Sequence, residues 1–108
     1  MKDILYLKEG RNRINLPFED IVYAEKYGAK VIIHAQERDY FIYETYISLQ
    51  KRLDDRFIRP HESFIFNLDH ISSIENSRVK MDNNACVGMC EKCIRKLRRG
   101  MDENACKY

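Results

Sequence analysis

The sequence predicts a mainly β domain, arranged as an antiparallel meander with one or two short helices. Apolar residues along most of the chain alternate with a period of two or form short β-branched and aromatic segments, a pattern typical of strands. Short polar turns such as Glu9-Gly10, Tyr27-Gly28 and Asp82-Asn83-Asn84 separate these segments, as hairpin connections do. Only in the stretch from Thr45 to Asp55, and again near the C-terminus, does the period change to that of a helix.

Ten strands are predicted along the chain. They are Ile4–Lys8, Arg13–Leu16, Ile21–Lys26, Lys30–Ala35, Tyr40–Tyr43, Phe57–Arg59, Phe64–Phe66, Ile71–Glu75, Arg78–Met81 and Ala85–Val87. In the helix of residues 45–55, Tyr46, Leu49 and Leu53 fall on one stripe. Thr45 precedes this helix and can cap its N-terminus.

A second, shorter helix is predicted from Met89 to Arg99. Ile94 and Leu97 would face the core, and Gly100 would end the helix because glycine readily adopts the conformation that follows a helix C-terminus. Residues 101–108 are expected to form a loose tail. With 108 residues, of which 44% are hydrophobic and 33% charged, the chain fits a single domain over residues 1–108.

The apolar runs of the chain are short. The longest have four residues, at Ile4–Leu7, Ile21–Ala24 and Tyr40–Tyr43, whereas a membrane helix needs about 20. Residues 1–3 lead straight into the first run, without the apolar region of a signal peptide. We therefore expect a cytoplasmic protein with no membrane partner.

Positive charge is concentrated near the C-terminus. Residues 1–85 carry 13 Lys and Arg against 14 Asp and Glu, whereas residues 86–100 carry five basic residues against Glu91 alone. Such a cluster suits a partner that carries phosphates, or an acidic membrane surface. A second explanation is also open, because Lys and Arg near a helix end favour the helix macrodipole.

The stretch that follows the first helix carries a recognisable motif. It reads Arg56-Phe57-Ile58-Arg59-Pro60-His61-Glu62-Ser63-Phe64-Ile65-Phe66-Asn67-Leu68-Asp69-His70-Ile71. With its His-x-Ser-aromatic-apolar-x-Asn pattern, it resembles the LytTR DNA-binding domain, the output module of many bacterial two-component response regulators. Ile21–Glu25 and Ser48–Leu53 are similar to two further segments of that family, in the same order and spacing.

The resemblance implies an elongated sandwich of small antiparallel sheets whose connecting loops, and not a recognition helix, enter the DNA grooves. It implies duplex DNA as the partner, with paired direct-repeat sites and a homodimer on the DNA. The β-rich module uses the 108 residues, so we expect no receiver domain in this chain. Whether the chain is an excised output domain or a short regulator stays open.

The resemblance also places DNA contacts in three segments. His61 follows Pro60 and precedes a strand, so we expect it on a loop at the rim of a sheet, where the family has its central DNA-facing loop. The turn between the third and fourth strands would be a second contact loop, and the basic C-terminal segment a third. The implied contact residues are Lys26, Tyr27, Lys30, His61, Glu62, Lys92, Arg95 and Lys96.

Two acidic residues depart from the family pattern. Glu62 stands where the family usually has a basic or polar residue, and Cys90-Glu91 replaces its Ser-basic pair. Phosphate oxygens repel a carboxylate, but Glu62 can accept a hydrogen bond from cytosine N4 and so read a base. The departures leave an alternative open, a protein-interaction module with weak or lost DNA binding. Ser63 and Asn67 we interpret as structural, satisfying backbone groups at strand ends.

The cysteines form a C-x3-C-x2-C run at Cys86, Cys90 and Cys93, with Cys106 further on. This spacing matches the iron–sulfur motif of radical S-adenosylmethionine enzymes, which have far longer chains, and four thiols could also hold zinc. We favour free cysteines of a reduced compartment, with no metal and no cofactor.

No enzymatic activity is predicted. Nucleophilic catalysis needs a base beside an activated thiol or hydroxyl, and His34, His61 and His70 carry no sequence sign of that arrangement. We interpret His34, inside a strand, and His70, in a tight loop, as packing or surface residues.

Overall fold

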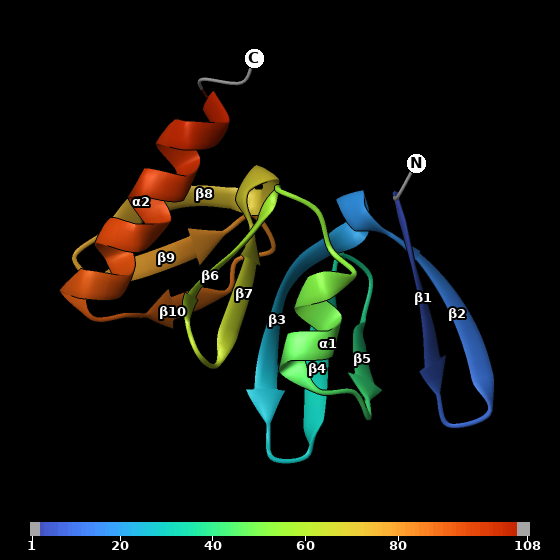
Figure 1. Ribbon diagram of the computed structural model, residues 1–108. Helices are drawn as coiled ribbons and strands as arrows, with labels where there is room; N and C mark the ends of the chain where they lie inside the picture. The colour runs from blue at the N-terminus through green and yellow to red at the C-terminus, as the bar shows by residue number, and fades with distance from the viewer. Residues whose placement is uncertain (1–2, 106–108) are drawn as a thin grey trace.

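The computed structural model describes residues 3–105 as three antiparallel sheets and two α-helices (Figure 1). The strands are β1 (Ile4–Glu9), β2 (Asn12–Pro17), β3 (Ile21–Tyr27), β4 (Lys30–Ala35), β5 (Asp39–Ile42), β6 (Phe57–His61), β7 (Phe64–Asn67), β8 (Ile71–Glu75), β9 (Arg78–Met81) and β10 (Cys86–Gly88). The helices are α1 (Tyr46–Lys51) and α2 (Glu91–Ala105), with 3-10 turns η1 (Phe18–Asp20) and η2 (Leu68–His70). All ten predicted strands are present, so the mainly β prediction is confirmed.

A five-stranded sheet of order β5-β4-β3-β7-β6 lies at the centre, flanked by the β1-β2 hairpin and by a sheet of order β10-β9-β8 (Figure 1). Successive residues of a strand point to opposite faces, and here both faces are buried. In β7, Ile65 belongs to a first core shared with α1 and the hairpin, whereas Phe66 belongs to a second core under α2. The domain extends 40 × 31 × 24 Å, which confirms the elongated sandwich.

The strand order of the central sheet differs from the predicted meander. β3 pairs antiparallel with β4 on one side and with β7 on the other. α1 and the loop after it carry the chain from β5, at one edge of the sheet, to the β6–β7 hairpin at the other edge (Figure 1). β3 therefore lies inside the sheet, and its residues Ile21 to Ala24 are all buried. Local periodicity contains no information on this long-range pairing.

The predicted cap of the first helix is confirmed. The Thr45 side-chain oxygen accepts a hydrogen bond from the backbone N–H of Ser48 at 3.1 Å, which satisfies one of the free donors at the start of α1. Tyr46 and Leu49 are buried in the first core. The helix ends at Lys51 and is shorter than predicted, although Leu53 still packs against the same core.

The prediction that Gly100 ends the second helix is wrong, because α2 continues to Ala105. Gly100 is buried, and a Cβ built on it would lie 2.9 Å from Cδ1 of Ile58 in β6. The missing side chain thus lets α2 pack closely on β6. Residues 101–105 of the expected tail are helical, and residues 106–108 lie outside the described part. No described helix is long and apolar enough to span a membrane.

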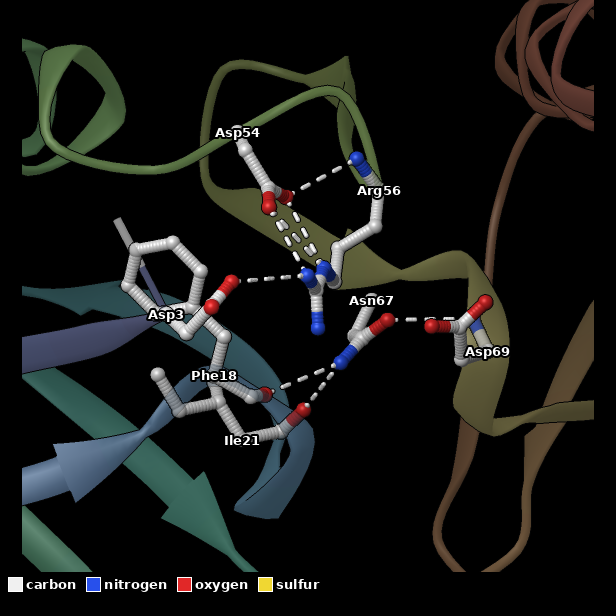
Figure 2. A network of polar contacts seen from close by, with 7 residues as sticks. All are labelled: Asp3, Phe18, Ile21, Asp54, Arg56, Asn67 and Asp69. Atoms are coloured by element: carbon white, nitrogen blue, oxygen red, sulfur yellow. Dashed lines mark hydrogen bonds and ion pairs between the residues drawn. The ribbon is translucent and has the colours of Figure 1, made fainter. Parts of the chain in front are cut away.

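The side chain of Asn67, at the end of β7, is completely buried and makes three hydrogen bonds to the backbone (Figure 2). Its Nδ2 donates to the carbonyl oxygens of Phe18 and Ile21, at 3.2 and 2.8 Å, on either side of η1. Its Oδ1 accepts from the backbone N–H of Asp69 in η2 at 3.0 Å. The interpretation of Asn67 as a structural residue is therefore confirmed.

We expect Asn67→Ala to lower the free energy of unfolding by about 2–4 kcal/mol, because two carbonyls and one N–H lose a buried partner. Asn67→Asp has nearly the same shape but cannot donate to Phe18 and Ile21, so it should rescue none of this loss. Asn83→Ala is the control, since Asn83 is exposed and bonds only the Ala85 N–H, at 3.1 Å. Urea denaturation measures the free energy of unfolding of all three variants. Equal losses for Asn67→Ala and Asn83→Ala would contradict the structural role of Asn67.

Candidate nucleic-acid interface

Two of the three predicted contact segments lie side by side. β3 pairs with β7, with Glu25 opposite Phe64, and the backbone N–H of Lys26 donates to the carbonyl of Ser63 at 2.9 Å. The β3–β4 turn and the β6–β7 turn therefore leave the central sheet together, and both point to the lower side of Figure 1. In the β3–β4 turn, Gly28 has a φ of 61°, a left-handed conformation that glycine adopts without strain.

The two turns line one hollow in the surface. Lys26 and Lys30 come from the β3–β4 turn, Glu62 from the β6–β7 turn and Arg59 from β6, and the start of α1 forms the remaining wall. None of these four side chains has an ion-pair partner among the described residues, whereas Arg52, nearby, is paired with Glu44 at 2.6 Å. The hollow thus offers three unpaired cations and one unpaired anion to solvent.

His61 is the last residue of β6, at the rim of the sheet, and its side chain is exposed. The sequence predicted a loop here, but His61 pairs with Phe64 across the strands, after an irregularity in the register that begins at Ile58. Its Nδ1 accepts a hydrogen bond from the backbone N–H of Ser63 at 3.0 Å. In the neutral ring the proton therefore resides on Nε2, which can donate to a phosphate or to a base acceptor.

The third segment lies on α2. Lys92, Arg95 and Lys96 are exposed along one stripe of the helix, opposite the buried Ile94 and Leu97. Because α2 extends to Ala105, this stripe occupies the first half of the helix, and the last turn contains no basic residue. The explanation of the basic cluster by the helix dipole is therefore wrong, because that effect is confined to the terminal turns.

A shared core connects the β6–β7 turn with α2. The rings of His61 and Phe64 lie 5.9 Å apart, and Phe64 packs against the second core. That core includes Met89 and Cys93 at the start of α2. Packing in the second core therefore connects the β6–β7 turn with the start of α2, although the two are separated by about 30 positions in the sequence.

Lys26, Lys30 and Glu62 thus line the same hollow. His61 lies at the end of β6, directly before the turn that carries Glu62. Tyr27 is 64% exposed at the tip of the β3–β4 turn and does not line the hollow. The three predicted residues of α2 stand on a separate element. Sequence reasoning missed Arg59, although a basic residue two positions before the motif histidine, on the exposed side of a strand, was a usable signal.

The other two histidines make polar contacts between separate elements of the fold. His34 of β4 lies between two carboxylates, with Nε2 2.7 Å from Glu25 and Nδ1 2.8 Å from Asp39. His70 is buried in η2, where its Nδ1 lies 2.6 Å from a carboxylate oxygen of Asp82. Both positions agree with the interpretation of these residues as packing or surface residues.

The cysteines of the described part do not gather into a metal site. Among residues 3–105, no three or more His, Cys, Asp and Glu side chains are placed to hold a metal ion. Cys90 and Cys93 are neighbours at the start of α2, whereas Cys86 lines a separate hollow with Arg78 and Lys80. Cys106 lies outside the described residues.

Comparison with known proteins identifies the family to which the chain belongs. The sequence model of the LytTr DNA-binding domain matches residues 11–102. A solved LytTr DNA-binding domain of a response regulator from Bacillus cereus superposes with a TM-score of 0.78 at 28% identity, over 94% of this chain and 98% of that chain.

Two curated relatives match over shorter segments. The sensory transduction protein LytT of Bacillus cereus is 38% identical over 58 residues, which are 53% of this chain and 24% of LytT. The accessory gene regulator protein A of Staphylococcus aureus is 33% identical over 76 residues, which are 68% of this chain and 32% of that protein. The chain thus spans about a quarter to a third of the length of these relatives. By its sequence, its fold and the placement of its motif, the chain belongs to the LytTr DNA-binding domain family.

Proposed function

We propose that this chain is the output domain of a bacterial transcriptional response regulator and binds specific duplex DNA through the β3–β4 turn, the β6–β7 turn and α2. One observation carries the proposal most strongly. Exposed Lys and Arg side chains on three separate elements have no carboxylate partner among the described residues. A phosphate backbone supplies the missing anions.

The chemistry of the side chains suggests a division of roles. Lys26, Lys30 and Arg59, around the hollow, are suited to phosphate oxygens, which position the domain on DNA without reading sequence. His61 offers an N–H donor at Nε2, and Glu62 beside it offers only acceptors. A donor and an acceptor side by side match the pattern that base edges present in the major groove, where cytosine N4 donates and guanine N7 accepts.

The larger context of the domain follows from the same proposal. Regulation of transcription requires access to chromosomal DNA, so we place the domain in the cytoplasm of a bacterial cell. We propose paired direct-repeat sites, with two copies of the domain forming a homodimer on the DNA. A direct repeat suits two domains in the same orientation, whereas a palindrome suits a two-fold symmetric pair.

Specific residues favour a second candidate function. Glu62 and Glu91 bring negative charge into the proposed contact segments, and Ile47 and Tyr43, beside the hollow, are 59% and 77% exposed. Acidic and apolar residues together are more typical of a protein-interaction surface than of a phosphate-binding surface. A LytTr-like module with weak or lost DNA binding is therefore the alternative.

Selection of bound sequences from a random duplex library separates the two functions. For the DNA-binding domain we expect enrichment of a motif that occurs twice in the same orientation. Titration of the selected duplex with salt should give an affinity that falls linearly in log K against log salt. A library that shows no enrichment after repeated rounds, with affinity independent of salt, would support the interaction module.

Arg95→Ala and Lys96→Ala should weaken binding almost equally on selected and unrelated duplexes. Each should also reduce the slope of log K against log salt by roughly 1, since each variant loses about one phosphate contact. Lys80→Ala is the matched control, because Lys80 is exposed on β9 and points away from the second core that its neighbours Val79 and Met81 enter. If a variant binds DNA like the control, the residue that it replaces does not belong to the proposed interface.

Glu62→Arg should strengthen binding to arbitrary DNA, because a carboxylate that faces phosphates becomes a cation. The gain should be larger at about 50 mM salt than at about 200 mM, since screening is weaker at low salt. Glu37→Arg makes the same charge change in the exposed β4–β5 turn, at the opposite end of β4, and should have the smaller effect. If the two variants gain equally at both salt concentrations, the β6–β7 turn does not face the DNA.

His61→Ala should cost about 1–3 kcal/mol of binding free energy on the selected duplex if Nε2 makes a base-edge contact. Because the side chain is exposed, the melting temperature should hardly change. His70→Ala provides the contrast, since His70 is buried and bonded to Asp82, and its removal should lower the melting temperature. Anisotropy and thermal melts on both variants test this, and a destabilised His61→Ala protein with full affinity would refute it.

A further inference from the structure

Two cysteines meet at the start of α2. Cys90 directly precedes the first helical residue, and its carbonyl oxygen accepts the N–H of Ile94 at 3.0 Å, so Cys90 is the N-cap. Its sulfur lies 3.3 Å from that of Cys93. Cys90 is exposed, whereas Cys93 is 8% exposed and belongs to the second core.

The surroundings make the two thiols chemically unequal. The backbone N–H of Cys93, together with its thiol, points at the sulfur of Cys90, and these hydrogen bonds lower the pKa of Cys90. The hydrogen bond to Cys90 and burial raise the pKa of Cys93. An exposed thiol that ionises easily is a nucleophile, and a protonated neighbour within reach can complete an exchange reaction.

The third described cysteine does not share this environment. In β10, Val87 enters the second core, so Cys86 before it points to the other face of the sheet. There it lines a hollow with Ser73 and Lys80, away from α2. Cys86 is exposed like Cys90, but it has no thiol neighbour among the described residues and does not lie at a helix N-terminus, which makes it an internal control.

We propose that Cys90 and Cys93 are a redox-active dithiol that low-molecular-weight disulfides, such as oxidised glutathione, convert reversibly into an intramolecular disulfide. The Cys90 thiolate attacks one sulfur of oxidised glutathione, forms a mixed disulfide and releases one glutathione thiolate. Cys93 then loses its proton, attacks the Cys90 sulfur and releases the second glutathione. The protein loses two protons and two electrons, and one oxidised glutathione becomes two reduced molecules.

The position in the fold allows this reaction. A covalent S–S bond requires the two sulfurs to approach by about 1.3 Å from their present separation. Cys90 lies at the helix terminus, where its side chain can move without breaking a hydrogen bond inside the helix. The inference concerns only the chemistry of the two thiols and does not depend on DNA binding.

The experiment uses the full chain with Cys86→Ser and Cys106→Ser, which keeps only the pair. This variant is equilibrated with mixtures of oxidised and reduced glutathione, quenched with acid, alkylated and analysed by peptide mass spectrometry. We expect a peptide that has lost two hydrogens and takes up no alkylating agent at either cysteine, and complete recovery of both thiols with dithiothreitol. Persistence of two free thiols in oxidised glutathione, or of a glutathione adduct on Cys90, would overturn the proposal.

Two further variants identify the role of each thiol. In Cys93→Ala the second step is missing, so glutathione should stay attached to Cys90. In Cys90→Ser, whose serine retains the N-cap, the buried Cys93 should take up no glutathione. In the parent chain, iodoacetamide at neutral pH should label Cys90 several-fold faster than Cys86. Equal labelling rates, or equal glutathione uptake in the two variants, would also contradict the proposal, and thermal melts confirm that each variant is folded.

Discussion

The buried amide of Asn67 is the contact on which the arrangement of the layers depends. It joins the end of β7 in the central sheet to η1, which connects the β1–β2 hairpin with β3, and to η2, which leads into the three-stranded sheet. Arg56 reinforces the same corner, because it pairs with Asp54 and Asp3 (Figure 2). Its carbonyl also accepts the N–H of Leu68. A buried amide whose three partners are all backbone groups tolerates few other arrangements, so both outer layers take fixed positions on the central sheet.

These positions bring the proposed DNA contacts to one side of the domain. The β3–β4 and β6–β7 turns are neighbours because β3 and β7 pair, and α2 is held to the β6–β7 turn through Phe64 and the second core. The proposed interface is therefore not carried by a single element. This differs from a recognition helix, whose contacts follow from one helical period.

Some basic side chains of the domain have an ion-pair partner and others have none. Arg38, Arg52 and Arg56 each have a carboxylate partner. The basic residues around the hollow and on α2 have none among residues 3–103, and the only unpaired anion at the hollow is Glu62. Exposed salt bridges contribute only about 0–1 kcal/mol to stability, so leaving these cations unpaired costs the fold little. The cations are thereby free to contact an external anion, as the proposed DNA binding requires.

Neighbours close in the chain were enough to predict the ten strands and the Thr45 cap, because alternation and capping are local patterns. The motif also predicted that His61 lies exposed at the rim of a sheet. The pairing of β3 with β7 and the continuation of α2 through Gly100 depend instead on residues far apart in the sequence, which only the folded chain brings together. Gly100 shows the reason most clearly. The structural role of this glycine depends on Ile58, which packs against it from about 40 positions away. In the sequence, a glycine that permits close approach cannot be distinguished from one that ends a helix.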